Sequence, residues 1–517
     1  MKKSITATLM FAAMLTVLIT ACSPAAGDGQ APAGGANGGS GATIFGEGDH
    51  LIIAAGAMAV NMHPHNMLDM HSAYLVNLVY DPLFRLNYAT MEVEYALAES
   101  SEMSDDLMSL RVTLRPGVTF HNGDPLTAEV VRDSLYGSRA SSLVGFIVAM
   151  IDNIEVHDDL NLTINLTQPF APFRNHLTHG SISIIHPDTT NDNPIGTGAF
   201  IQESIILGDR VEFVANENFW GPRSHINRIT WRAVPESTAR LIEVESGGAH
   251  VAWNIRPSDI PRILEDPNLA LQRNTSVASH HLAFQAEKTP FYDIRVRHAV
   301  AYALDIPLLS YTAYEGSGSP ADSFITSVIT YHYSIPARPQ NIERALELMA
   351  EAGFPDGFST TIEFYSENPV YGGLAVMISS MLREINIEAT VIQFELGQFL
   401  ERILSGQHEL MLVSWNTMTG DADYGLFDTQ HSTGFPMGGN QSFFQTPQID
   451  RLLEEGRAVY DTARRAEIYR EIQQLIHHYA AYIPIHHDER IHATVHNLRG
   501  FDVNPTGIID LWNVYFD

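Results

Sequence analysis

The sequence contains a single cysteine, Cys22, in 517 residues. No internal disulfide can form, and a zinc site built from several cysteine thiolates is excluded. Lysine is also scarce, with only Lys2, Lys3 and Lys288, so arginine supplies almost all the positive charge. Acidic residues outnumber basic ones by 60 to 30, which gives a formal net charge of −30. Because no run of Lys or Arg provides a basic stripe, we expect no binding to nucleic acid.

The motifs of common hydrolases are missing as well. The chain holds no Gly-x-Ser-x-Gly nucleophile elbow, no His-Glu-x-x-His zinc helix and no Ser-x-x-Lys nucleophile motif. The corner formed by Gly196, Thr197 and Gly198 is predicted to be a tight turn and not a phosphate loop, because no lysine follows it. These absences favour a protein that binds a ligand over one that catalyses a reaction.

The N-terminus has the pattern of an export signal that ends at Cys22. Residues 1–21 combine two lysines with an apolar stretch over residues 7–19, which is too short for a comfortable membrane span. The run Leu-Ile-Thr-Ala-Cys over residues 18–22 resembles the bacterial lipobox, in which the cysteine thiol receives a diacylglycerol. We therefore predict lipid attachment at Cys22. Residues 22–42 are rich in Gly, Ala, Pro and Ser and are predicted to form a flexible linker.

Strand-like and helix-like segments alternate from residue 51 onward. Thr127 and Asn341 are each followed by helical spacing and are predicted to cap helices, with Gly353 just past the end of the second one. Arg295 and Arg297 are predicted to open a helix and to pair with carboxylates. Over residues 340–480 the alternation is regular, which indicates an α/β unit with helices connecting the strands of a sheet.

Four segments in this body carry a recognisable pattern. They are residues 95–135 (YALAESSEMSDDLMSLRVTLRPGVTFHNGDPLTAEVVRDSL), 194–221 (with PIGTGAF and NENFWG), 290–305 (PFYDIRVRHAVAYALD) joined by 343–358, and 440–487. In this order they resemble the extracellular solute-binding proteins of family 5. Members of that family are the peptide- and nickel-binding proteins of ABC importers.

The resemblance implies an α/β fold of the two-lobed, periplasmic-binding-protein-like kind (type II), with an extra inserted domain and a two-segment hinge. Lobe I is expected over residues 43–90, 200–285 and 488–517, the inserted domain II over residues 91–199, and lobe II over residues 286–487. Ligand would be captured by hinge closure and delivered to the membrane permease. We expect a monomer that is lipid-anchored outside the cytoplasm, in the periplasm or on the outer face of the cytoplasmic membrane, and that needs no cofactor.

The same resemblance directs attention to residues 412–431 as the ligand site. Trp415 matches a tryptophan of the peptide-binding members. In those members an aspartate three residues after the tryptophan pairs with the ligand's α-ammonium. Here that position is Met418, so Asp421 and Asp423 become candidates to replace the missing carboxylate. The candidate ligand-binding residues are therefore Trp415, Met418, Asp421 and Asp423.

A second interpretation, with nickel or a metal chelate as cargo, rests on histidines. Metal-binding members of the family often have a His near the mature N-terminus and another beyond the tryptophan loop, and His63, His65 and His431 lie at roughly those places. Imidazole and thioether groups suit nickel or copper. Two other classes stay open from the sequence: an unrecognised hydrolase, and a receptor or chaperone that binds peptides without feeding import.

Overall fold

The computed structural model describes residues 48–517, apart from 68, 88, 367 and 435–438. The predicted signal segment 1–21, the acceptor Cys22 and the linker 22–42 lie outside the described residues. Within the described part of the chain, no helix combines the length and apolar character needed to cross a bilayer.

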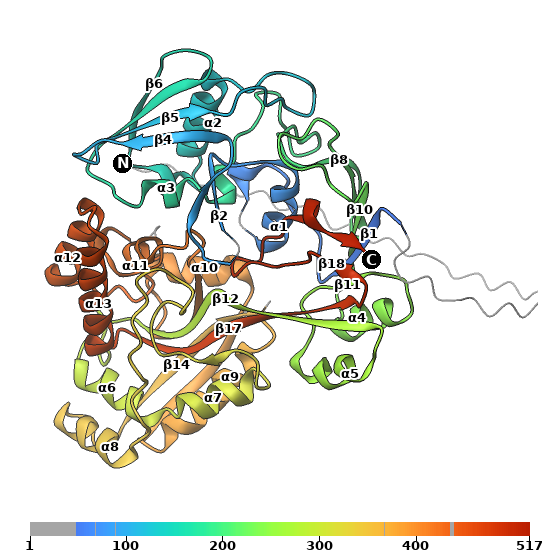
Figure 1. The fold of residues 1–517 in the computed structure, drawn as a ribbon. Helices are drawn as coiled ribbons and strands as arrows, with labels where there is room; N and C mark the ends of the chain where they lie inside the picture. The colour runs from blue at the N-terminus through green and yellow to red at the C-terminus, as the bar shows by residue number, and fades with distance from the viewer. Residues whose placement is uncertain (1–47, 68, 88, 367, 435–438) are drawn as a thin grey trace, which may run out of the picture. The chain divides into compact units, whose positions relative to one another are not determined.

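A mixed sheet of 11 strands runs through most of the described chain (Figure 1). In spatial order its strands are β15 (Ile387–Phe394), β14 (Phe358–Tyr365), β16 (Leu410–Asn416), β12 (Leu269–Phe284), β17 (Tyr482–Val495), β11 (Val251–Ala252), β1 (His50–Ala55), β10 (Arg228–Ala233), β9 (Arg210–Ala215) and β8 (Phe200–Ile206), with β13 (Ser319–Pro320) beside β17. The sheet is curled, and it contains parallel pairs such as β14 with β15 as well as antiparallel ones such as β12 with β16.

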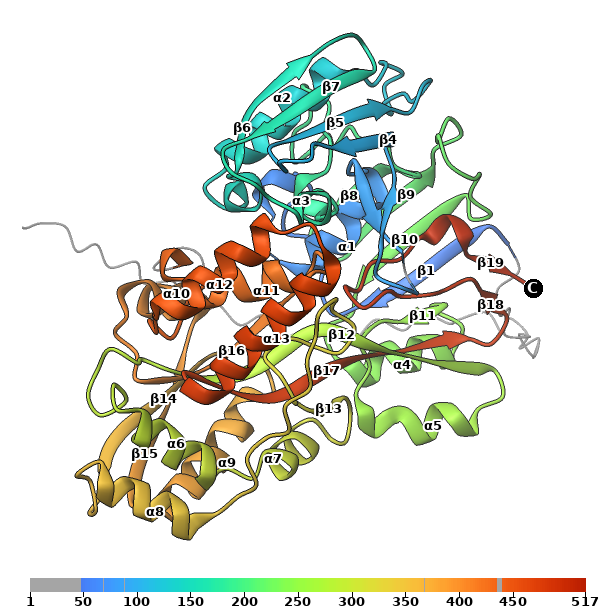
Figure 2. The same ribbon diagram turned by 60° about the vertical axis from the view of Figure 1, so that its left-hand side comes forward.

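Two long strands connect the two ends of this sheet. Strands β12 and β17 run side by side across the molecule in both views (Figures 1 and 2), paired antiparallel from Leu269 opposite Val495 to Ala283 opposite Tyr482. One end of the pair adjoins β11 and β1, and the other adjoins β16 and β14. The described chain is therefore a two-lobed α/β protein whose lobes share one continuous sheet.

Helices cover the sheet and fill the connections between strands. They are α1 (Met70–Val79), α2 (Ala128–Ala140), α3 (Phe173–His176), α4 (Ser237–Glu245), α5 (Ile260–Glu265), α6 (Ile294–Ala303), α7 (Ile306–Ala313), α8 (Ile342–Glu351), α9 (Tyr371–Arg383), α10 (Leu396–Ser405), α11 (Ala422–Gln430), α12 (Pro447–Ala458) and α13 (Thr462–Tyr479). The alternation of helices and strands predicted for residues 340–480 is confirmed by α8 to α13 and the strands between them.

A separate antiparallel sheet of four strands lies apart from the large one, with α2 against it (Figure 2). Its order is β4 (Ala98–Met103), β5 (Ser109–Leu114), β7 (Asn161–Leu166) and β6 (Ile151–Val156). Two short pairs complete the strands: β2 (Phe84–Leu86) with β3 (Val93–Tyr95), and β18 (Leu498–Arg499) with β19 (Tyr515–Phe516).

Buried apolar residues form four separate hydrophobic cores, which follow the division between the two ends of the large sheet and the four-stranded sheet. One core draws on residues 51–80, 199–269 and 491–514, and a second draws on residues 83–195 together with Tyr424. A third lies mainly over residues 282–412, and a fourth packs α10, α12 and α13 against the sheet. Each part of the chain thus buries its own apolar surface, which is the condition for lobes that keep their internal structure.

The predicted helix caps are confirmed. The side chain of Thr127 accepts a hydrogen bond from the Val130 amide at the start of α2, and that of Asn341 accepts one from the Arg344 amide at the start of α8. Gly353 lies two residues past the end of α8 with φ of +89°, in the region where glycine is favoured.

The prediction for the two arginines at the start of α6 is only half right. Arg295 pairs with the carboxylate of Asp293, with its Nε 3.0 Å from Oδ1. Arg297 is buried and donates instead to the main-chain carbonyls of Phe291, at 2.7 Å, and Tyr479, at 2.9 Å. Burial lowers the pKa of Arg297 to about 10. Its position inside the fold, which the sequence does not reveal, brings it to carbonyl groups and not to a carboxylate.

Candidate functional site

A cavity of about 280 Å³ lies where three distant segments of the chain meet. Its volume is near the lower end of the about 300–1,000 Å³ that small-molecule sites span. We call it the central cavity. Its lining residues are Met67, Asp69, Met70, Ala73 and Asn77 from around α1, Leu143, Val144, Phe146, Ile147, His179, Gly180 and Ser181 from around η2 (Gly145–Val148) and η3 (Gly180–Ile182), Ser414, Trp415, Asn416, Met418 and Tyr424 from β16 and α11, and Ile508.

Aromatic rings form one wall of the central cavity. Trp415 sits near the end of β16, where β12 fixes its position through pairing with Ser279, and its ring centroid is 5.9 Å from that of Tyr424. The Tyr424 ring in turn stacks at 6.3 Å on Phe146. The indole Nε1 of Trp415 is shielded from solvent and has no hydrogen-bond partner among the described residues. A buried N–H group without a partner is unfavourable unless a ligand or water accepts from it.

A second donor comes from His179. Its Nδ1 accepts a hydrogen bond from the Ser181 amide at 3.1 Å, so the neutral ring carries its proton on Nε2. Burial lowers the pKa of His179 to about 4, which keeps the imidazole neutral at pH 7. A neutral N–H donor on a lining residue suits a ligand that offers carbonyl or other acceptor oxygens.

The two aspartates proposed from the sequence are occupied elsewhere. Asp421 makes a two-pronged ion pair with Arg465, with both N–O distances 2.9 Å. Asp423 pairs with Arg457 at 2.8 and 3.0 Å and with Nε2 of His176 at 3.2 Å. Burial would raise the pKa of Asp423, but Arg457 and His176 outweigh it and hold that pKa well below its ordinary value. Neither carboxylate lines the central cavity, so this arrangement lends no support to either as a ligand anchor.

The three candidate metal ligands are not brought together around the central cavity, and none of them lines it. The rings of His63 and His65 meet edge-on at 5.2 Å, and Nε2 of His65 lies 3.3 Å from the Ser183 carbonyl oxygen. His431 bonds through Nδ1 to the Thr433 hydroxyl at 2.7 Å. Among the described residues no group of three or more His, Cys, Asp or Glu side chains could hold a metal ion.

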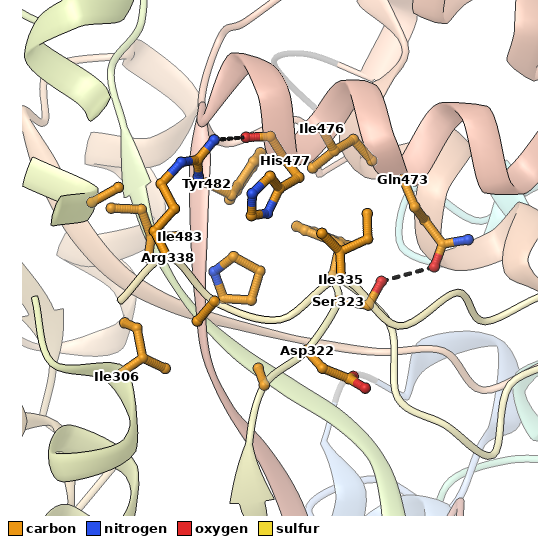
Figure 3. Close-up of a pocket in the computed structure, with 15 residues that line it drawn as sticks. Ile306, Asp322, Ser323, Ile335, Arg338, Gln473, Ile476, His477, Tyr482 and Ile483 are labelled. Carbon is orange, nitrogen blue, oxygen red and sulfur yellow. Dashed lines mark hydrogen bonds between the residues drawn. The ribbon is translucent and has the colours of Figure 1, made fainter. Parts of the chain in front are cut away.

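A smaller pocket of about 40 Å³ lies beneath α13 (Figure 3). Two hydrogen bonds are drawn there: the Ser323 hydroxyl donates to Gln473 at 2.8 Å, and Arg338 donates to the His477 carbonyl at 2.7 Å. Such a volume holds a few water molecules and not a peptide. The central cavity is the better candidate for a ligand.

Direct contacts join the part with the four-stranded sheet to the part with α11 and α12. The Asn175 side chain donates to the Thr419 carbonyl at 3.1 Å, and the Ala171 amide donates to the Arg457 carbonyl at 2.7 Å. Trp415 also packs against the core of the four-stranded part. These contacts hold the two parts against each other.

Sequence patterns placed two of the four proposed ligand residues, Trp415 and Met418, in the lining of the central cavity. They missed Phe146 and His179, which follow no motif and reach the site only because the chain folds back on itself. Tyr424 could have been found, because it lies within the 412–431 stretch and one turn into the helix that follows the tryptophan.

A two-lobed α/β fold with a shared sheet and a cavity between its parts is the architecture of periplasmic solute-binding proteins. The chain matches the family described as bacterial extracellular solute-binding proteins, family 5, over residues 92–436, and it belongs to that family. Proteins of this family are extracytoplasmic substrate-binding proteins of ABC importers and not enzymes. The family membership and the fold predicted from the four segments are confirmed.

Named relatives differ in what they bind. The glutathione-binding protein GsiB of Escherichia coli O1:K1 is 27% identical over 474 residues, covering 88% of this chain and 92% of the relative. The structure of DppA from Helicobacter pylori in complex with the peptide STSA superposes with a TM-score of 0.80 at 25% identity, over 92% of this chain and 99% of that one. NikA from Staphylococcus aureus in complex with Ni(L-His)2 gives a TM-score of 0.77 at 20% identity, over 91% and 100%.

Proposed function

We propose that this protein captures di- and oligopeptides for an ABC importer. The observation that carries the proposal is the central cavity, which combines an aromatic wall with the N–H donors of Trp415 and His179. Peptide ligands present amide carbonyls that accept such hydrogen bonds and side chains that pack against aromatic rings. The peptide-bound relative DppA supports this choice of cargo.

Capture works through closure of the lobes. The lining residues come from three parts of the chain, so a ligand touches all of them only in the closed arrangement. A ligand that contacts both lobes when they are closed shifts the population toward that state. We further propose that the closed protein docks on the permease and that a lipid on Cys22 holds it at the outer face of the membrane.

Glutathione is the first specific peptide to test, because of the relative GsiB. Its two carboxylates call for cationic partners, yet the lining residues of the central cavity include no arginine or lysine. Arg85 lines a cavity that shares His179 and Met418 with the central one, but it lies 3.5 Å from Glu94 and is partly neutralised. We therefore rank peptides without acidic side chains ahead of glutathione.

A nickel chelate is the alternative cargo. One observation favours it: Met67, Met70, Met418 and His179 all line the central cavity, and thioether and imidazole groups interact with nickel or copper. A chelate brings its own ligands to the metal and needs only packing and a few hydrogen bonds from the protein. This alternative does not require His63, His65 and His431 to meet.

Native mass spectrometry of residues 43–517, purified without chelators from a rich medium, tests the cargo directly. We expect a ladder of adducts with peptide masses. One adduct with the isotope pattern of nickel would contradict the peptide proposal and support the chelate. Calorimetry with tripeptides, glutathione and Ni(L-His)2 then ranks the candidate ligands by affinity. Trp415→Ala should weaken the binding of whichever ligand occupies the central cavity.

A further inference from the structure

A second space, which we call the adjacent cavity, has a volume of about 330 Å³ and lies next to the central cavity. The same two segments of the chain line both spaces. Around η2, Ile147 lines the central cavity and Met150 lines the adjacent one. On α11, Tyr424 lines the central cavity and Phe427 lines the adjacent one. The two spaces therefore follow one another along the boundary between α11 and the part with the four-stranded sheet.

Phe146 is the residue that the two linings share. Its ring stacks on that of Tyr424 across the boundary, with centroids 6.3 Å apart and an angle of 26° between the ring planes. Phe146 is nevertheless 40% exposed, whereas core rings such as Phe170 are fully buried. A ring that lines two spaces and keeps this exposure is accessible to a ligand. The stacked pair of Phe146 and Tyr424 thus separates the two spaces.

The backbone on either side of Phe146 is held in place. A Cβ atom at Gly145 would lie 2.5 Å from the Arg139 carbonyl oxygen, so the chain before Phe146 packs directly against the end of α2. The Ile147 carbonyl oxygen accepts a hydrogen bond from Nδ1 of His176 at 2.8 Å, which ties the chain after Phe146 to α3. The fold of the part with the four-stranded sheet therefore places the Phe146 ring between the two spaces.

The volumes of the two spaces bear on the size of the cargo. The central cavity alone, at about 280 Å³, is close to the lower limit of about 300 Å³ for small-molecule sites. Together with the adjacent cavity it would reach the middle of the range that such sites span. Since an extended peptide grows by about 3.4 Å per residue, a few residues are enough to exceed the smaller space. Whether the two spaces are joined therefore decides how long a bound peptide can be.

We propose that Phe146 is a specificity-determining residue that limits the length of the cargo. Its ring ends the central cavity, so that peptides of about two or three residues fit and longer ones collide with it. A smaller side chain at this position joins the two spaces and admits longer peptides. The inference rests on the proposed function, since it assumes that the central cavity holds the ligand.

The test compares dialanine with hexa-alanine, two peptides of the same side chain and different length, by calorimetry. We expect wild type to bind dialanine about tenfold more tightly, because a steric collision opposes the longer peptide. Phe146→Ala should bring the two affinities together, whereas the control Phe146→Trp keeps an aromatic ring and should retain the preference. A merely structural role of Phe146 would weaken both peptides equally and leave their ratio unchanged.

A second variant checks that the adjacent cavity receives the longer peptide. Ala149 lines that cavity and is exposed, so a tryptophan there fills the space without disturbing a core. Adding Ala149→Trp to Phe146→Ala should remove the gain in hexa-alanine binding and leave dialanine binding unchanged. Equal binding of both peptides by wild type, or a preference that Phe146→Ala leaves unchanged, would overturn the proposal.

Two neutral probes that are not peptides, N-propylacetamide and N-octylacetamide, separate this proposal from that of the peptide cargo. In NMR titrations Phe146→Ala should raise the affinity for the octyl amide relative to the propyl amide by about tenfold. If this ratio rises but no peptide binds, the peptide cargo is wrong and the role of Phe146 stands. If Trp415→Ala weakens peptide binding while Phe146→Ala changes neither length preference, the role of Phe146 is wrong and the cargo stands.

Discussion

The Nε2 atom of His176 lies 3.2 Å from the Oδ2 atom of Asp423, although 247 positions separate the two residues in the chain. His176 ends α3, beside the four-stranded sheet, and Asp423 begins α11, beside the cavity wall that contains Trp415 and Tyr424. Both side chains are buried. The contact thus joins the part with the four-stranded sheet to the part with α11, and it uses a carboxylate that the sequence offered as a candidate ligand contact.

Replacing Trp415 with alanine should weaken ligand binding by at least about 1 kcal/mol, because the ligand loses an aromatic wall and an N–H donor. Calorimetry with the peptide pool identified by mass spectrometry measures the change. Trp415→Phe keeps the apolar surface and should recover part of the affinity, and Tyr292→Ala, at an exposed position, should leave it unchanged. Unaltered affinity in Trp415→Ala would place the ligand outside the central cavity.

Replacing Asp421 with asparagine should lower the free energy of unfolding by about 3–5 kcal/mol, because Arg465 is left buried without its partner. Urea denaturation measures this loss. The control is Glu347→Gln, which breaks an exposed pair with Arg344 and should cost less than about 1 kcal/mol. A large drop in peptide affinity at unchanged stability would instead show that Asp421 contacts the ligand.

Acid should destabilise the protein in part through buried neutral histidines such as His281. Its ring is 4.1 Å from that of Phe324, and neither ring nitrogen has a partner among the described residues. Burial, together with His487 and His280, holds the pKa of His281 well below 6.5. Since the folded-state pKa is the lower one, the contribution to stability is present above about pH 6.5 and declines as the pH falls below it.

His281→Phe removes this titration and keeps an aromatic ring against Phe324. We expect the free energy of unfolding to rise by about 1 kcal/mol at pH 7.5, because an unsatisfied polar ring is replaced. Between pH 6.5 and pH 5 the free energy of unfolding should fall less steeply in His281→Phe than in wild type, by up to about 1.4 kcal/mol per pH unit. Urea titrations at several pH values measure both effects, and a slope equal to that of wild type would contradict this explanation.

Introducing a carboxylate with Met418→Asp should create a site for ammonium groups, because Met418 lines the central cavity. Relative to wild type, we expect Met418→Asp to increase the preference for a free tripeptide over its N-acetylated form by about tenfold. Calorimetry with the two peptides measures the preference, and Met418→Leu is the uncharged control. Failure of Met418→Asp to discriminate would mean that ammonium groups do not reach this position.

Local patterns in the sequence were sufficient for the family, the fold class and the starts of the helices that Thr127 and Asn341 cap. The side chains of Thr127 and Asn341 cap helices through hydrogen bonds to amides three residues further on, so neighbouring residues alone determine these caps. The four family-like segments similarly depend on short runs that keep their order along the chain. They led correctly to a two-lobed solute-binding protein. Trp415 and Met418, which they proposed as ligand contacts, line the central cavity.

Only the tertiary structure decided which of the neighbouring carboxylates are paired with arginines. Asp421, Asp423 and Asp428 occur within eight positions of one another and look alike in sequence. The first two face arginines from α12 and α13, whereas Asp428 lines a cavity with an unpaired oxygen. Whether a carboxylate is neutralised depends on partners brought close by packing of distant segments, and sequence spacing carries no information about that proximity.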